Sequence, residues 1–141
     1  MEELRGGPFP PFPPFPVRGV RARYVRQAGC PSDFADVTVD FEPWEDGVLL
    51  EVAREATVVG TIPADELRLW HEAFVDGVRE ELAARGVDGV AAAVVVRRTV
   101  VHDVDSSAHS FRAAGRVAVR EAFVRIDGPP PRTKRRRTRL T

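Results

Sequence analysis

The chain has 141 residues, of which 43% are hydrophobic and 30% are charged. This length predicts one globular domain with a core of its own and excludes two domains of ordinary size. No apolar run approaches the ~20 residues that a membrane-spanning helix needs, and the start of the chain lacks a secretory signal pattern. The single cysteine, Cys30, allows no internal disulfide, so we expect a cytoplasmic protein.

Opposite charges cancel over the whole chain but are segregated along it. The segment at 132–139, RTKRRRTR, contains six basic residues and no acidic one. The rest of the chain is acidic by six charges, because 21 acidic residues there face the remaining 15 basic ones. Between residues 33 and 88 the acidic side chains far outnumber the basic ones. We expect this central surface to repel nucleic acid and the tail to attract it.

A segment rich in proline and phenylalanine opens the chain. Residues 7–16 read GPFPPFPPFP, and neither a helix nor the interior of a sheet accommodates that density of proline. We therefore expect residues 1–16 to form an arm in the polyproline II conformation. Two interpretations stay open. The arm is either a ligand for an aromatic-lined groove on a partner, or a spacer or a segment packed on its own domain through Phe9, Phe12 and Phe15.

Three strands are predicted after this arm. Residues 17–26 and 35–42 alternate apolar or aromatic residues with polar ones, which is typical of strands with one wet face. Residues 27–34, QAGCPSDF, have the composition of a loop, and residues 43–47 that of a turn. Residues 48–54, VLLEVAR, supply the third strand.

A helix is predicted over residues 61–85. Thr61 can cap this helix, and Pro63 suits its first turn. Apolar side chains at spacings of three and four form a stripe that faces the core, comprising Leu67, Trp70, Phe74, Val78 and Leu82. We expect His71, next to this stripe, at a packing boundary or on a solvated face.

A buried strand and a second helix complete the domain. Residues 90–101 are rich in valine and form a long strand, which we expect to be buried on both faces in its first half. Residues 106–126 form a helix with Asp105 as its cap. One side of this helix allows close approach to a neighbour because its residues are mostly small: Phe111, Ala114, Gly115, Ala118 and Ala122.

The resulting order of elements is β-β-β-α-β-α, which predicts an α+β fold in the form of a two-layer sandwich. We place the globular domain at residues 17–127. Gly128 and the prolines that follow it end the domain. Residues 128–141 then form a basic, disordered tail.

Several motifs, in order, resemble domain IV of translation elongation factor G. Residues 102–107, HDVDSS, and the small-residue helix after them are similar to the loop and helix near the end of that domain. Residues 60–63, GTIP, resemble the Gly-Val-Ile-Pro segment by which the family enters its first helix. Residues 26–29, RQAG, followed by ADVTVDFEP, resemble its Arg-Gln-x-Gly loop and second strand. The resemblance covers residues 21–125 without large gaps.

The resemblance implies both a topology and a place of action. It implies a β-α-β crossover of left-handed sense, and it brings the loops at 29–34 and 101–106 together at one tip of the domain. In the family this tip enters the decoding site of the small ribosomal subunit, beside transfer RNA and messenger RNA. The tip residues that it implies as RNA or ribosome contacts are His102, Asp103, Ser106, Ser107, Gln27 and Gly29.

The chain departs from the family pattern in three places. The family's tip loop typically reads Gly-Gly-Arg-Gly-Gln, whereas residues 29–33 read GCPSD, so an arginine suited to phosphate is replaced and an acid is introduced. Ala108 stands where the family has the glutamate that completes a capping box with Asp105. No Gly-x-x-x-x-Gly-Lys-Ser/Thr loop occurs in the sequence, so we expect no GTP binding by this chain.

The residue pattern gives little support to catalysis or metal binding. In the family geometry Cys30 and His102 would approach each other at the tip, which suits a thiolate–imidazole nucleophile, but no oxyanion donor is identifiable. His71, His102 and His109 lack the spacing and the partners of a zinc site. We predict no catalytic residue, no metal and no cofactor. A cysteine hydrolase is kept as a third hypothesis, after the two given next.

The leading hypothesis is a non-enzymatic, translation-factor-like protein, without a GTPase domain, that binds the ribosome or ribosomal RNA. The tail would supply charge to that contact through Arg132, Lys134, Arg135, Arg136, Arg137 and Arg139. The alternative is a protein–protein interaction module, unrelated to translation, that uses the Phe-Pro arm and the acidic surface.

Overall fold

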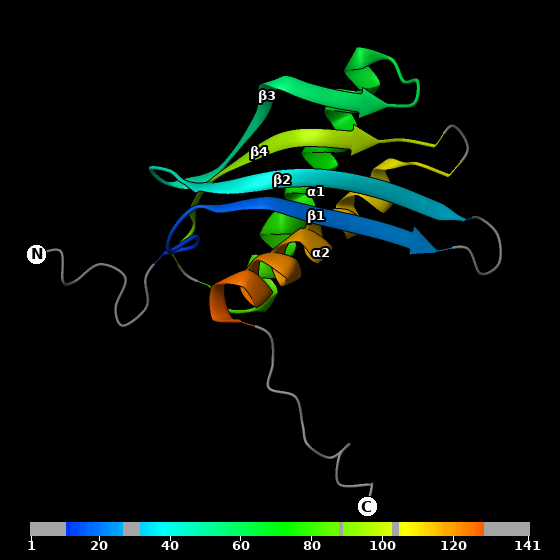
Figure 1. Cartoon of the computed structure of the whole chain (residues 1–141). Helices are drawn as coiled ribbons and strands as arrows, with labels where there is room; N and C mark the ends of the chain where they lie inside the picture. The colour runs from blue at the N-terminus through cyan, green and yellow to red at the C-terminus, as the bar shows by residue number, and fades with distance from the viewer. Residues whose placement is uncertain (1–10, 27–31, 88, 103–104, 129–141) are drawn as a thin grey trace, which may run out of the picture.

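The computed structural model describes residues 11–26, 32–87, 89–102 and 105–128 of the chain (Figure 1). Its elements follow in the order β1 (Val17–Arg26), β2 (Asp33–Pro43), β3 (Gly47–Val59), α1 (Ala64–Ala84), β4 (Ala91–Val100) and α2 (Ala108–Asp127). The predicted order β-β-β-α-β-α and the α+β class are therefore confirmed. No helix in the described ranges is both long and apolar enough to cross a membrane.

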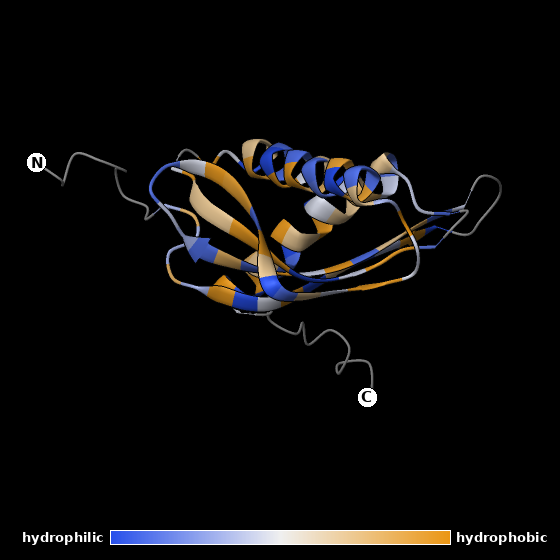
Figure 2. Ribbon diagram, turned by 90° about the horizontal axis from the view of Figure 1, so that it is seen from above, coloured by the Kyte–Doolittle hydropathy of each residue, from blue (hydrophilic) through white to orange (hydrophobic). Residues whose placement is uncertain are grey.

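The four strands form one sheet in the order β1-β2-β4-β3. The β1–β2 and β2–β4 pairs are antiparallel, whereas β3 and β4 are parallel. Both helices lie on the same side of the sheet, as Figures 1 and 2 show from two directions. The molecule is thus the predicted two-layer sandwich, and no described segment covers the other face of the sheet.

The connection from β3 through α1 to β4 has an unusual hand. In Figure 1 the helices lie behind the sheet, β3 and β4 both run to the right, and β4 lies below β3. This arrangement is a left-handed crossover, whereas about 98% of such connections are right-handed. The resemblance to the family implied this hand, and the periodicity of the sequence contained no information about it.

The core lies between the sheet and the helices. Val37, Val39 and Phe41 alternate along β2 toward the helices and are completely buried. On β4 the residues from Ala92 to Val96 are all buried, at consecutive positions that point to opposite faces. The prediction that the first half of this strand is buried on both faces is confirmed.

The two helices approach each other closely through a pair of glycines. A Cβ atom added to Gly77 of α1 would overlap the backbone oxygen of Arg112, and one added to Gly115 of α2 would overlap that of Phe74. The helix backbones therefore touch where both side chains are absent. This contact confirms the prediction that the small face of α2 allows close approach to a neighbour.

His71 was wrongly predicted at a boundary or on a solvated face. Its side chain is buried, and its Nε2 lies 2.9 Å from Oγ1 of Thr99 on β4. Burial lowers the pKa of His71 from 6.5 to about 4. The imidazole is accommodated inside because Thr99 satisfies one ring nitrogen.

Two strand boundaries differ from the predictions because pairing across the sheet extends the strands. β2 begins at Asp33, since Asp33 and Phe34 pair with the last two residues of β1. β3 continues to Val59 rather than ending at Arg54, since its last three residues pair with β4 after a shift of register. Composition indicated a loop at Asp33. The β-branched residues Thr57, Val58 and Val59 are typical of a strand, but the predicted strand ended before them.

The beginnings of both helices also differ from the predictions. The N-cap of α1 is Pro63, without a side-chain cap, so Thr61 lies outside the helix. The N-cap of α2 is Ser107 rather than Asp105, and it forms a reciprocal capping box with Ser110. The missing glutamate at Ala108 is therefore irrelevant to this cap, because the box is formed by two serines.

The described part of the Phe-Pro arm packs on the domain. Phe12 is 3% exposed, and its ring contacts Phe41 and Phe123 with centroids 5.3 Å apart in each pair. Its backbone nitrogen donates to the oxygen of Gly89. Phe15 is 49% exposed, and Phe9 lies outside the described residues. Phe12 of the arm is thus a core residue, whereas Phe15 is exposed.

Candidate nucleic-acid interface

One end of the sandwich, the tip, is formed by the start of β2 and by the segment that joins β4 to α2. The backbone nitrogen of Phe34 donates to the oxygen of Asp105 at 3.0 Å. The hydroxyl of Ser106 donates to the oxygen of Phe34 at 2.9 Å. The predicted neighbourhood of the two tip loops is confirmed for their described residues.

His102 is the most accessible aromatic group of the tip. Its ring stacks on Phe34 with centroids 3.8 Å apart and planes only 4° from parallel. Half of its side chain is exposed, and Nδ1 lies 3.9 Å from a carboxylate oxygen of Asp105. The ring is therefore supported on one face by Phe34 while part of it stays open to solvent.

Ser106 holds the tip loop in place. Its Oγ accepts a hydrogen bond from the backbone nitrogen of His102 at 2.9 Å while donating to Phe34. The backbone nitrogen of Ser106 donates in turn to the oxygen of His102. Ser106 is 9% exposed, so its hydroxyl is directed inward and fixes the position of His102. Ser107 similarly uses its side chain to cap α2.

A shallow pocket of about 250 Å³ adjoins His102. Trp70 forms an aromatic wall, and Ile62 and Val101 supply apolar surface; the other lining residues are Thr61, Pro63, Glu66, His102 and Ser106. The ring of Trp70 is itself held by stacking on Phe111, with centroids 5.2 Å apart. The tip therefore offers both an exposed ring and a partly apolar recess.

The uncovered face of the sheet carries ion pairs in which the acid is buried and the arginine is exposed. The Asp36 side chain is 4% exposed, whereas Arg21, which binds it through two nitrogens, is 59% exposed. This hydrogen bonding raises the pKa of Arg21 above its ordinary value. Asp40 is buried in the same way beneath Arg97. Part of the predicted acidic central surface is therefore not at the surface.

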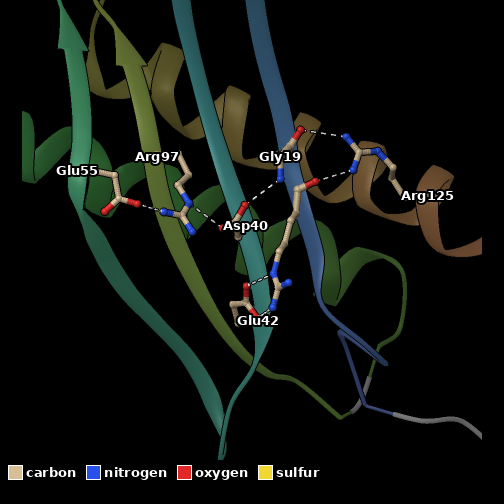
Figure 3. Close-up of polar contacts among 7 residues, drawn as sticks. Gly19, Asp40, Glu42, Glu55, Arg97 and Arg125 are labelled. Carbon is tan, nitrogen blue, oxygen red and sulfur yellow. Dashed lines mark hydrogen bonds and ion pairs between the residues drawn. The ribbon is translucent and has the colours of Figure 1, made fainter.

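Asp40 also joins β1 to β4 across the sheet, and Gly19, which it contacts, is bonded to the end of α2 (Figure 3). Its carboxylate accepts from the backbone nitrogen of Gly19 at 2.8 Å and from Arg97 at 2.8 Å, and Arg97 also pairs with Glu55. Arg125 of α2 donates to the oxygen of Gly19 at 3.0 Å. Gly19 has a φ of +67°, which a glycine adopts without strain, and it lies where the β1–β2 register shifts.

Several predicted contact residues lie outside the described ranges. They are Gln27, Gly29 and Asp103 at the tip, and the basic residues 132, 134–137 and 139 of the tail. Cys30, the proposed partner of His102 in a hydrolase, lies outside them as well. Among the described residues, no three His, Cys, Asp or Glu side chains gather to hold a metal ion.

The sequence interpretation missed Phe34 and the arginines of β1. Phe34 was assigned to a loop, although the apolar residue directly before the alternating segment is compatible with one more strand position. Arg21 and Arg23 are two residues apart, a spacing that places both on one face of a strand. That signal is present in the sequence, but the acid that pairs with these arginines, Asp36, is on the neighbouring strand, and the alternation within one strand does not reveal that pairing.

Comparison with known proteins agrees with this architecture. Residues 15–125 match the family model described as elongation factor G, domain IV. The chain is 34% identical over 114 residues to elongation factor G 2 of Streptomyces coelicolor, covering 76% of this chain and 16% of the relative. It is 31% identical over 108 residues to elongation factor G of Dehalococcoides mccartyi, covering 74% of this chain and 15% of the relative.

A solved structure from Thermus thermophilus has the same fold. It is 24% identical, with a TM-score of 0.56, and the match covers 74% of this chain and 15% of that one. The chain thus corresponds to one segment, about a sixth, of the curated relatives described above. The match of 111 positions from 15 to 125, together with the shared fold, shows that this chain belongs to the elongation factor G domain IV family.

Proposed function

We propose that this chain is a non-enzymatic, translation-factor-like protein that binds the ribosome or ribosomal RNA. The observation that carries the proposal is the match of residues 15–125 to domain IV of elongation factor G. The relatives in which that domain occurs are named elongation factors. A role at the ribosome further implies a cytoplasmic location. The sequence contains no phosphate-binding loop for GTP, so the proposed role is binding rather than hydrolysis.

The tip is the proposed point of contact with RNA. His102 supports this role because its ring is half exposed and rests on Phe34 with a near-parallel stack. Such a supported ring can stack on an unpaired base, which is the usual way in which proteins hold single-stranded RNA. Asp103, Gln27 and Gly29 are proposed as further contacts on the resemblance alone. Ser106 and Ser107 position the loop through their inward hydrogen bonds.

The basic tail is proposed to add an electrostatic contact. Six basic residues between 132 and 139 would neutralise up to six phosphates. Each neutralised phosphate contributes ~0.7–0.9 to the slope of log affinity against log salt, so six give a slope of roughly −4 to −5. This contribution is independent of RNA sequence, whereas the tip would set the position of the chain.

Co-sedimentation with ribosomes over a salt series tests the proposal. We expect the full chain to pellet with ribosomes at low salt and to be released as the salt concentration rises. Removal of residues 132–141 should take away most of that salt dependence. A full chain that stays in the supernatant at every salt concentration would overturn the proposal.

The contribution of the tip is tested by His102→Ala. We expect this variant to pellet less than the wild type at moderate salt, because a stacked base is worth about 1–3 kcal/mol. His109→Ala is the matched control, since His109 is exposed on α2 and is not among the residues that form the tip contacts. Equal losses in the two variants would argue against a specific role for the tip.

A further inference from the structure

We propose that the uncovered face of the sheet binds the phosphate backbone of RNA through three arginines, Arg21, Arg23 and Arg98, which we call the sheet-face cluster. This inference rests on the proposed function and adds to it a second surface, which adjoins the tip ring and is distinct from the tail. Its ligand is a run of phosphodiester groups, recognised by charge and hydrogen bonding. The cluster lies in the half of the sheet nearer the tip.

The register of the sheet brings the three arginines together. Arg21 of β1 is opposite Thr38 of β2, Thr38 is opposite Arg98 of β4, and Arg98 is opposite Thr57 of β3. Residues directly opposite one another point to the same face. Arg23 shares that face because it is two residues from Arg21 on the same strand. Arg21 and Arg98 are two strand spacings apart, or about 10 Å.

The charge of the cluster is directed outward. Asp36 pairs with two of the arginines of the cluster, at 2.6 Å from Arg21 and 3.7 Å from Arg23. Its side chain is 4% exposed, while those of Arg21 and Arg23 are 59% and 55% exposed. One buried carboxylate therefore holds two exposed guanidinium groups in place, and a net positive charge remains toward solvent. Guanidinium groups that are already held in place lose less conformational entropy on binding a phosphate than freely rotating ones do.

Arg98 adds to the net positive charge of the cluster. It is exposed, and in the part of the chain that the structure describes it forms no ion pair. Its neighbours in the row are the hydroxyl residues Thr38 and Thr57, which can also donate to phosphate oxygens. The row thus consists of two arginines and two threonines. The row itself contains no aromatic or aliphatic side chain, although the adjacent row on this face ends at the edge strand in Val59, which is 46% exposed. The guanidinium and hydroxyl donors of the row match phosphate oxygens, which favours RNA as the ligand.

The rest of the same face carries more acidic than basic side chains. Toward the other end of the sheet it carries four acids, Asp40, Glu42, Glu51 and Glu55, with Arg18 and Arg97 as the paired bases. Phosphate groups would be repelled there and attracted to the cluster. This difference in charge between the two ends of the sheet would direct a bound RNA strand toward the tip.

The cluster is continuous with the tip. The guanidinium carbon of Arg23 lies 5.7 Å from the centroid of the Phe34 ring, on which His102 is stacked. If one base of an RNA strand stacks on His102, the phosphates next to that base would lie within reach of Arg23. The stacking surface and the sheet-face cluster would thus form a single track.

The test measures the binding of a fluorescently labelled, single-stranded oligouridine to the full chain over a potassium chloride series. The variant is Arg23→Gln with Arg98→Gln, which keeps the bidentate Arg21–Asp36 pair and hence the fold. We expect binding to weaken severalfold and the log–log salt slope to decrease by about 1.4, or about 0.7 for each lost contact. Arg23→Lys with Arg98→Lys should retain most of the slope because the charges remain.

The matched control is Arg68→Gln with Arg79→Gln, which removes the same charge from exposed positions on α1. A slope that decreases equally in the control and in the cluster variant would overturn the inference, as would an unchanged slope in the cluster variant. Absence of oligouridine binding by the wild type would also overturn it. The proposed function is judged separately by ribosome co-sedimentation, so the two failures are distinguishable.

Discussion

The two faces of the sheet are built from the same strands and differ in nearly every physical respect. The face toward the helices is dry: Val37, Val39 and Phe41 of β2 are completely buried there, and the helices above it touch at Gly77 and Gly115. The uncovered face carries arginines whose paired carboxylates are buried. The comparison indicates that the first face supplies stability and that the second is available for binding.

The largest effect is expected where the two helices touch. Gly77→Ala with Gly115→Ala should lower the free energy of unfolding by about 3 kcal/mol or more, because each added Cβ overlaps a backbone oxygen and the helices must separate. Urea unfolding followed by circular dichroism measures this loss. Gly89→Ala is the control, since its added Cβ would meet Pro11 at an ordinary 3.4–3.5 Å. A double variant as stable as the control would contradict the close packing.

The covered face should also be sensitive to acid through His71. Its folded pKa of about 4 is below the ordinary 6.5, so the unfolded chain binds a proton more readily. The stabilising effect of a neutral His71 is therefore complete above pH 6.5 and is lost as the pH falls toward 4. Between pH 7.5 and pH 5 we expect a loss of about 2 kcal/mol.

Urea unfolding of the wild type and of His71→Gln at both pH values isolates this effect. The glutamine can still bond to Thr99 but does not titrate between the two pH values, so the variant should lose about 2 kcal/mol less than the wild type. Equal losses in the two proteins would show that His71 does not control the acid response.

A smaller effect is expected at the tip, where the two faces meet. Ser106→Ala removes a buried hydroxyl that bonds to both His102 and Phe34 and leaves their backbone groups unpaired. The expected loss is about 1–2 kcal/mol, together with faster hydrogen exchange at the His102 amide. Asp105→Ala is the control, because its side chain is not the helix cap. Equal losses would argue against the serine as the residue that holds the loop.

The smallest effect is expected on the uncovered face. Arg18→Gln removes an ion pair with Glu42 in which the arginine side chain is 63% exposed. Exposed pairs contribute little to stability, so the urea midpoint should not change measurably. A decrease similar to that caused by the glycine substitutions would contradict the division of roles between the two faces.

The sequence predicted the order of elements because hydrophobic periodicity is a local property. The alternation along β2 and the helical spacing of Phe74, Val78 and Leu82 are visible within a few residues of each position. The neighbourhood of the two tip loops came from the resemblance of HDVDSS and its companion motifs. Local periodicity and motif resemblance can both be recognised in the sequence without knowledge of the tertiary structure.

The features that escaped prediction depend on contacts between distant segments. Phe12 is a core residue because it meets Phe41 and Phe123, which are far along the chain. Asp36 and Asp40 are buried because arginines on neighbouring strands cover them. The cap of α2 was missed for a different reason, since the choice between Asp105 and Ser107 depends on the backbone at the helix start.

Directed hydroxyl-radical probing from Cys30 tests most directly whether the tip meets ribosomal RNA. Cys30 is the only cysteine of the chain and lies three residues before Asp33, the first residue of β2, so an iron chelate attached to its thiol marks the tip. The same chelate attached to the thiol introduced by Asp46→Cys, in a chain that also carries Cys30→Ser, would mark the β2–β3 turn at the far end. We predict strand cleavage confined to one region of small-subunit RNA from Cys30 and little from the far end. Equal or absent cleavage from the two positions would contradict binding through the tip.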